Sequence, residues 1–184
     1  MEPTGHLAGD VRGGDRSRGD HWQRGNRRLA CQGASLGGRR KRGAFEQAIG
    51  RSRGGRTTTL HALTDDLGRP RVLLLAPGNQ HDATMAPELL RLAGPIARLI
   101  ADKAYDTNKL RQLLAGLDID AVIPSVARRK PLIPYDAVVY RLRNLIERMF
   151  GRLKDFRRIA TRYDKLARNF LASIVLAAIV IWWI

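Results

Sequence analysis

The sequence predicts an α/β fold in which helices cover a sheet, and three observations lead to that prediction. Short runs of β-branched and apolar residues, which are typical of strands, recur from residue 57 onward. Stretches with helical periodicity stand between these runs. Residues that favour turns, at 65–68 and 77–78, separate the two kinds of segment. A chain of 184 residues has the length of one ordinary domain.

The expected elements alternate along the chain. Strands are expected over 57–62, 71–76, 97–101 and 121–123. Helices are expected over 82–92 and 107–116, from about 135, and from about 166. Asp82 is a candidate N-cap for the first helix, and Gly116 is a candidate stop for the second.

The N-terminal part has a different composition. Residues 1–56 hold 13 of the 18 glycines and 13 of the 33 lysines and arginines. Such sequence buries too little apolar area to offset chain entropy, so residues 1–43 are expected to be a disordered basic segment. The folded domain is expected over 44–184. A tail without selected structure is the preferred interpretation of the basic segment, and an arm that grips phosphates is the alternative.

Charge and cysteine content exclude several classes of protein. The formal charge of +16 points first to nucleic acid and second to an anionic membrane surface. A single cysteine excludes a disulfide scaffold and a cysteine-based zinc site, and it fits a reducing cytosol. The apolar run over 170–184 rises roughly 22 Å as a helix, against about 30 Å of hydrocarbon. A buried helix is therefore expected there, and no membrane span.

The segment 140–154 predicts a strongly amphipathic helix. At 100° per residue, Tyr140, Arg143, Glu147 and Lys154 fall in one stripe roughly 60° wide. Leucine, isoleucine and methionine side chains fall on the opposite side. Periodicity alone fits a solvated face with an Arg143–Glu147 ion pair.

The spacing within this helix carries further information. Tyrosine, two residues, arginine, three residues, glutamate, six residues and lysine follow one another over 140–154. The chain thereby resembles the DDE-type bacterial insertion-sequence transposases with a Y-R-E-K signature, within insertion-sequence family five. Further words over 44–184 resemble the same group: "GRSRGG" at 50–55, "LTDDLGRP" at 63–70, "ADKAYD" at 101–106, "AVIPS" at 121–125 and "FRRIATRYDKLARNFLA" at 156–172.

The resemblance implies a fold and a chemistry. The fold would be ribonuclease H-like, with a long amphipathic helix and an apolar C-terminal helix. Three carboxylates would hold divalent ions, Mg²⁺ or Mn²⁺, for phosphodiester cleavage and strand transfer at insertion-sequence ends. By motif, Asp102 would be the second acid and Glu147 the third, both as catalytic residues and metal ligands. The same resemblance assigns contacts with the DNA backbone to Tyr140, Arg143 and Lys154. The neighbouring basic residues Arg148, Arg157 and Arg158 are also expected to bind DNA phosphates.

The partners that the resemblance implies are DNA, at the transposon ends and at the target, and a second copy of the chain in a homodimer. The place of action would be the bacterial cytoplasm, at the nucleoid.

The first catalytic aspartate of this group is missing from its expected place. It should lie on a strand before "GRSRGG", but Asp10, Asp15 and Asp20 lie in sequence rich in glycine and arginine. The expected fold therefore lacks its first strand, and residues 1–43 suggest translation in another reading frame. The chain is interpreted as a defective or partial transposase, with a non-catalytic DNA-binding remnant that occupies transposon ends as the alternative.

Other polar residues favour structural roles. Asp106 is expected to cap a helix, and Asp65 and Asp66 to lie in a solvated turn. His61 is interpreted as a sheet histidine with satisfied hydrogen bonds, or else as a group at the edge of the site.

Overall fold

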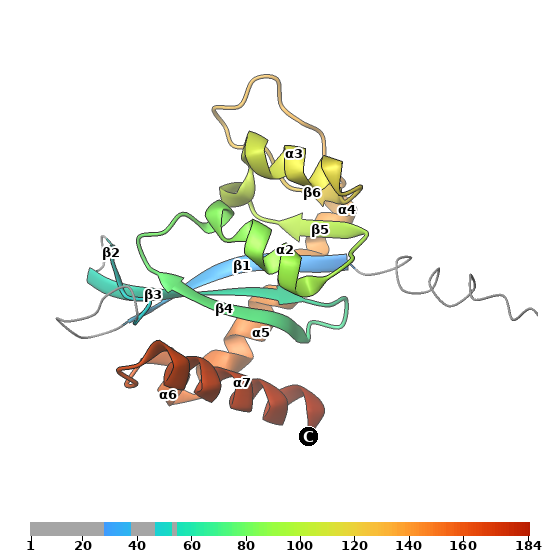
Figure 1. The fold of residues 1–184 in the computed structure, drawn as a ribbon. Helices are drawn as coiled ribbons and strands as arrows, with labels where there is room; N and C mark the ends of the chain where they lie inside the picture. Colours follow the sequence, from blue (N-terminus) through green and yellow to red (C-terminus); the bar gives the residue numbers. More distant parts are fainter. Residues whose placement is uncertain (1–27, 38–46, 53–54) are drawn as a thin grey trace, which may run out of the picture.

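A computed structural model describes residues 28–37, 47–52 and 55–184. Its sheet has the strand order β4-β3-β1-β5-β6, and the short β2 pairs with the start of β3 (Figure 1). The strands are β1 (Arg28–Gly37), β2 (Gly50–Ser52), β3 (Gly55–Thr64), β4 (Pro70–Pro77), β5 (Arg98–Ala101) and β6 (Asp120–Val122).

Strand β1 lies in the middle of this sheet. It pairs antiparallel with β3, from Ala30 opposite Thr64 onward, and parallel with β5, where Cys31 lies opposite Ala101. The structure thus places a strand over 28–37, where the sequence led us to expect a disordered segment and a sheet without its first strand. The segment lacks the alternating pattern of a half-buried strand, but two neighbouring strands supply hydrogen bonds to its backbone, and that context overrides local propensity. The rest of the expected disordered segment, 1–27 and 38–43, lies outside the described residues.

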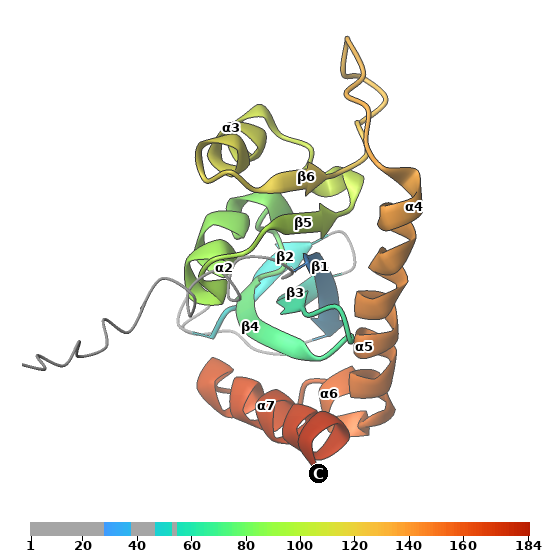
Figure 2. The same cartoon turned by 90° about the vertical axis from the view of Figure 1, so that its right-hand side faces the viewer.

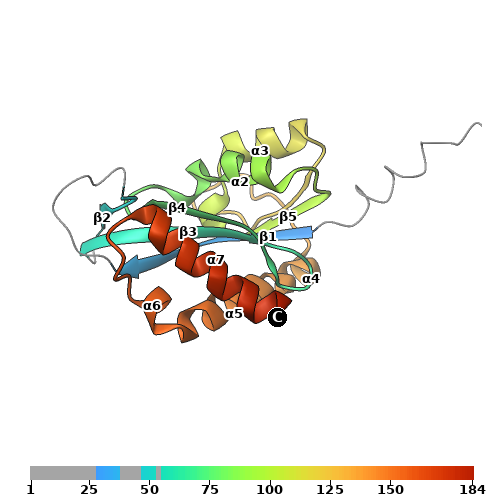
Figure 3. The ribbon, with the colours of Figure 1, turned by 60° about the horizontal axis from the view of Figure 1, so that its bottom comes forward.

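Helices cover both faces of the sheet (Figures 1 and 3). On one face, α2 (Ala86–Ala93) and α3 (Asn108–Gly116) pack with one cluster of apolar side chains. On the other face, α5 (Asn144–Asp155) and α7 (Ala167–Trp183) pack with a second cluster. Both faces of β3 are consequently buried, which explains its near-continuous run of buried positions.

Three helix boundaries differ from the expectation. The segment 82–92 divides into a short 3₁₀ turn, η1 (Asp82–Thr84), and α2, and His81 rather than Asp82 caps η1. Asp136, rather than Tyr135, precedes the next helix and accepts hydrogen bonds from its first amides. That helix is α4 (Ala137–Tyr140), and the 3₁₀ turn η3 (Arg141–Arg143) links it to α5 along one side of the sheet (Figure 2).

The C-terminal helix contacts the sheet through β4 and buries Phe170 and Ile174, while Leu176 and Val180 are exposed. No helix among the described residues combines the length and apolarity needed to cross a membrane. The short α6 (Arg157–Ala160) lies between α5 and this helix in the sequence. Arg162, which follows α6, is buried. The Arg162 guanidinium donates to the carbonyl oxygens of Gln47, Asp164 and Lys165, which fixes the start of the C-terminal segment.

The expected turn at 65–68 is present. The Asp65 carboxylate accepts hydrogen bonds from the amides of Leu67, at 3.0 Å, and Arg69, at 2.9 Å, and Gly68 adopts a positive φ of 77°. Asp65 is only partly exposed because these bonds hold it, whereas Asp66 is solvated as expected.

Candidate functional site

Asp102 lies where the sequence places it, directly after β5. Its carboxylate accepts a hydrogen bond of 2.9 Å from the amide of Ala104 and caps a short 3₁₀ turn, η2 (Lys103–Tyr105). Because β1, β5 and β6 run parallel, Asp102 stands at the carboxyl edge of the parallel part of the sheet. The side chain is half-buried and open to a ligand from solvent.

A second aspartate, which the sequence analysis treated only as a helix cap, belongs to the same neighbourhood. Asp82 lies in η1, which contacts η2. Burial raises the pKa of Asp82 and the Asp102 carboxylate raises it further, while His81 opposes both. No local pattern marks this proximity, since it arises only when the chain after β4 returns over the sheet edge.

His61 in β3 lies near one of these two carboxylates, that of Asp82. It is fully buried, and its Nδ1 lies 4.0 Å from Oδ1 of Asp82. Neither ring nitrogen has a hydrogen-bond partner among the described residues, so the expectation of a satisfied sheet histidine is wrong. The alternative, a group at the edge of the site, agrees with this position. Burial lowers the pKa of His61 to about 4.

The depressed pKa of His61 makes a prediction about stability. The unfolded chain takes up a proton near pH 6.5, whereas the folded chain resists it until about pH 4. Stability from neutral His61 is thus present above pH 6.5 and falls by up to about 3 kcal/mol as the pH drops to 4. His61→Leu should remove this part of the pH dependence, measured by urea unfolding at both pH values. Equal pH dependence in both proteins would contradict a buried, neutral His61.

Three residues of the Y-R-E-K signature, Tyr140, Arg143 and Glu147, interact with one another. Glu147 on α5 is about half exposed, and its carboxylate accepts a hydrogen bond from Arg143, as the i,i+4 spacing predicts. The Arg143 guanidinium carbon lies 5.8 Å from the centre of the Tyr140 ring. Burial raises the pKa of Tyr140, Arg143 opposes this, and Asp102 and Glu147 raise it further. The Tyr140 hydroxyl is therefore within electrostatic reach of both expected acids.

The donor set for divalent ions is incomplete in the part of the chain that the structure describes. Over those residues, no three histidine, cysteine, aspartate or glutamate side chains gather closely enough to hold a metal ion. Strand β1 occupies the place of the expected first acid strand, but its sequence, RLACQGASLG, contains no carboxylate. The pairing of β1 with β5 ends at Cys31 opposite Ala101, directly before Asp102. Asp102 and Glu147 therefore do not fit a complete two-ion site.

The basic residues expected to contact DNA lie on three consecutive elements: Arg143 in η3, Arg148 and Lys154 on α5, and Arg157 and Arg158 in α6. The helix buries Ile146, Met149 and Leu153, as its periodicity predicts. The cations on its other side and in α6 are exposed: Arg148, Arg152, Lys154, Arg157 and Arg158. Two of the expected contacts already have an acidic partner, since Arg143 pairs with Glu147 and Arg158 with Asp164 at 2.9 Å.

Asp106 has a role that the sequence analysis did not predict. Thr107, not Asp106, caps α3. The fully buried Asp106 carboxylate accepts hydrogen bonds from Arg111 Nε at 2.7 Å, Arg129 Nε at 2.8 Å and the amide of Val126 at 2.8 Å. Burial alone would raise the pKa of Asp106, but these hydrogen bonds outweigh it and lower the pKa to about 2. Asp106 thereby anchors the loop that follows β6.

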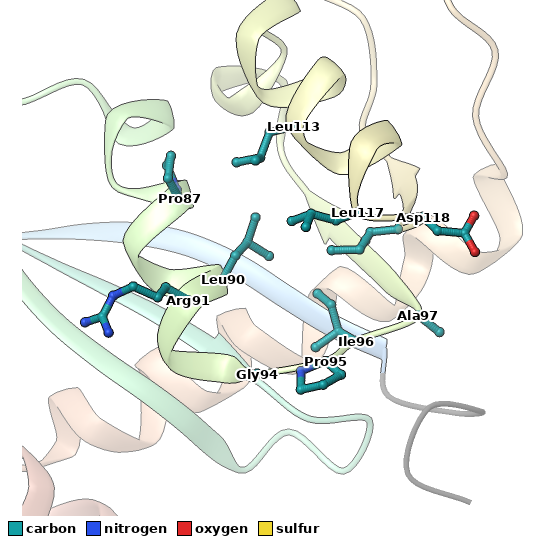
Figure 4. Close-up of a pocket in the computed structure, with 11 residues that line it drawn as sticks. Pro87, Leu90, Arg91, Gly94, Pro95, Ile96, Ala97, Leu113, Leu117 and Asp118 are labelled. Carbon is teal, nitrogen blue, oxygen red and sulfur yellow. The ribbon is translucent and has the colours of Figure 1, made fainter. Parts of the chain in front are cut away.

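A pocket of about 670 Å³ lies away from these residues, between α2 and α3 (Figure 4). Leu90, Leu113 and Leu117 line it, together with Ile96 and Ala97, which precede β5. Asp102 follows the opposite end of that strand. The pocket is therefore separate from the site around Asp102.

Comparisons with known proteins agree with this architecture. The family model described as "Transposase DDE domain" matches residues 33–183. A Brucella ovis (strain ATCC 25840 / 63/290 / NCTC 10512) protein, named as a transposase for insertion sequence element IS6501, is 36% identical over 127 residues. That match covers 68% of this chain and 98% of the relative. A Burkholderia cepacia protein, named as a transposase for insertion sequence element IS402, is 27% identical over 134 residues, which cover 67% of this chain and 61% of that protein.

A solved structure shows a similar fold. It is the cryo-EM structure of the simian T-cell lymphotropic virus intasome in complex with the PP2A regulatory subunit B56 gamma. One of its chains aligns with a TM-score of 0.50 and 14% identity, over 98% of this chain and 52% of that chain. The likeness concerns the fold alone, and it is compatible with a ribonuclease H-like arrangement of this mixed α/β sheet.

Proposed function

Because the chain belongs to the DDE transposase family, we propose that it binds DNA at the ends of an insertion sequence and that its catalytic site is incomplete. The observation that carries this proposal is the contrast between α5 and β1. The outer side of α5 keeps its exposed cations. Strand β1, in contrast, brings no carboxylate to the position beside Asp102.

The basic face of α5 and α6 supports DNA as the ligand. Arg148, Lys154 and Arg157 are exposed, and no ion pair occupies them among the described residues. Lysine and arginine on one surface bind phosphates and release counterions, which gives affinity without sequence preference. The partners on this proposal are transposon ends and target DNA, at the bacterial nucleoid.

The reaction of the family requires three acids, and this chain supplies two of them. Asp102 and Glu147 are the acids that this chain would contribute to phosphodiester cleavage and strand transfer, with Mg²⁺ or Mn²⁺ as the ion that neutralises transition-state charge. Glu147 is engaged by Arg143 and would have to exchange that partner. Because β1 contains no carboxylate to serve as the first acid, we infer a defective transposase that occupies DNA ends.

A homodimer is part of this proposal. Helix α7 leaves large apolar side chains exposed, among them Leu176 at 64% and Val180 at 53%. An apolar helix face of this kind favours association. Sedimentation equilibrium of the full chain should therefore show a concentration-dependent dimer, and a monomer at all concentrations would contradict it.

Salt-dependent DNA binding tests the proposed interface. Lys154→Ala should weaken binding to a short duplex and reduce the slope of log affinity against log salt by about one unit. Lys109→Ala is the matched control, because Lys109 is also exposed but lies on α3, on the opposite face of the sheet. An unchanged slope in Lys154→Ala, or an equal change in Lys109→Ala, would show that α5 does not face DNA.

A further inference from the structure

The loop between β6 and α4 is fixed at both of its ends. Near its start, the amide of Val126 and the side chain of Arg129 donate to Asp106. Toward its end, the Ser125 hydroxyl accepts from the amide of Ile133 at 3.0 Å and donates to the carbonyl of the same residue at 3.3 Å. A ligand that binds this loop therefore meets a largely preorganised surface.

The same loop exposes a mixture of apolar and basic side chains. Leu132 is 67% exposed, and Arg128 and Lys130 are exposed on either side of Arg129. Figure 2 shows the loop projecting beyond β6 and the start of α4. Single-stranded nucleic acid binds to surfaces of this composition, where cations follow the phosphates and apolar or aromatic groups meet the bases.

The end of the loop adjoins the residues around Tyr140. The Tyr135 ring centre lies 5.4 Å from that of Tyr140, with 76° between the ring planes. The Arg143 guanidinium carbon lies 5.8 Å from the centre of the Tyr140 ring, and Arg143 pairs with Glu147. Helix α4, which ends at Tyr140, contacts β5, the strand that Asp102 follows. An edge-to-face contact occupies at most one face of each ring, and Tyr135 remains 40% exposed. One face of Tyr135 is thus available for stacking close to the two acids.

We propose that Tyr135 stacks on an unpaired nucleobase of the bound DNA, at the strand end that lies beside Asp102 and Glu147, while Arg128 and Lys130 hold the flanking phosphates. This inference rests on the proposed function, because it requires that the chain binds DNA. It adds a base-binding residue outside the Y-R-E-K signature and a role for the preorganised loop. It also predicts a preference for ends with single-stranded extensions.

The test uses the full chain and a short duplex with a single-stranded 3′ extension that carries 2-aminopurine. Stacking quenches the fluorescence of this base. Tyr135→Ala should abolish the quenching and weaken binding of the extended duplex by about 5- to 150-fold, with a smaller effect on a blunt duplex. Tyr135→Phe and Tyr135→Trp should keep the quenching. Tyr163→Ala is the matched control, because Tyr163 is 60% exposed but lies after α6.

The outcomes separate this inference from the proposed function. Quenching that persists in Tyr135→Ala, or that is lost in Tyr135→Trp, would overturn the role of Tyr135. If Lys154→Ala still flattens the salt dependence in that case, the proposed DNA binding stands without a role for Tyr135. Loss of quenching in Tyr163→Ala to the same degree would also overturn the inference. If the wild-type chain does not bind the blunt duplex, both proposals fail.

Discussion

Asp106→Ala is expected to lower the free energy of unfolding by about 3–5 kcal/mol, because it leaves two largely buried guanidinium groups without their shared carboxylate. Arg111 and Arg129 are only 13% and 17% exposed, so water cannot replace the lost partner fully. The amide of Val126 also loses its acceptor. Urea unfolding of the full chain at neutral pH measures this change.

The lowered pKa of Asp106 allows a second test of why Asp106→Ala loses stability. Its stabilising effect is present above the unfolded pKa near 4 and is lost as the pH falls toward about 2. Asp106→Ala should therefore approach the stability of the wild type in strong acid. Asp66→Asn is the control, because this aspartate is solvated in a turn and should change stability by less than about 0.5 kcal/mol. A loss of stability in Asp106→Ala that is independent of pH would contradict the ion-pair account.

Gln32→Asp is expected to give the chain a metal-dependent nicking activity at least about 100-fold above that of the wild type. Gln32 follows Cys31, which pairs with Ala101 directly before Asp102. On the proposed function, an aspartate at this position of β1 would supply the missing acid, and ions held by three acids would stabilise transition-state charge by several kcal/mol, where each 1.4 kcal/mol is about tenfold in rate. Nicking of end-containing duplex with Mg²⁺ or Mn²⁺ measures it.

Two variants control this gain. Gln32→Asn changes the side chain without adding charge and should remain inactive. Adding Glu147→Gln to Gln32→Asp should abolish the gained activity while DNA binding persists, because Glu147 is the acid assigned to α5 by the signature. If Gln32→Asp binds metal and DNA but never cleaves, the missing carboxylate on β1 is not what limits this chain.

The parts of the fold that depend on local periodicity were predictable. The spacing along α5 predicted which side of the helix is buried, and Ile146, Met149 and Leu153 are indeed in the core. The position of Asp102 after a short apolar run was predicted for the same reason. In such segments, the pattern of side chains and the final burial are determined within a few residues.

The parts that depend on distant partners were not predictable. Strand β1 is stabilised by β3 and β5, which follow it far along the chain, and its own sequence carries no strand periodicity. The partner of Asp106 at Arg129 is 23 residues away, so a cap was the simpler local interpretation. The approach of Asp82 to His61 likewise requires the chain to cross the sheet edge.

One measurement tests the central claim, that this member of the DDE transposase family binds DNA but lacks the carboxylate needed for cleavage. The full chain is incubated with end-containing duplex and Mg²⁺, and binding and nicking are followed in the same sample. The account predicts binding that weakens steeply with salt and no nicking above the level without protein. Nicking that Asp102→Asn removes would contradict it, because the acid set would then be complete without a carboxylate on β1.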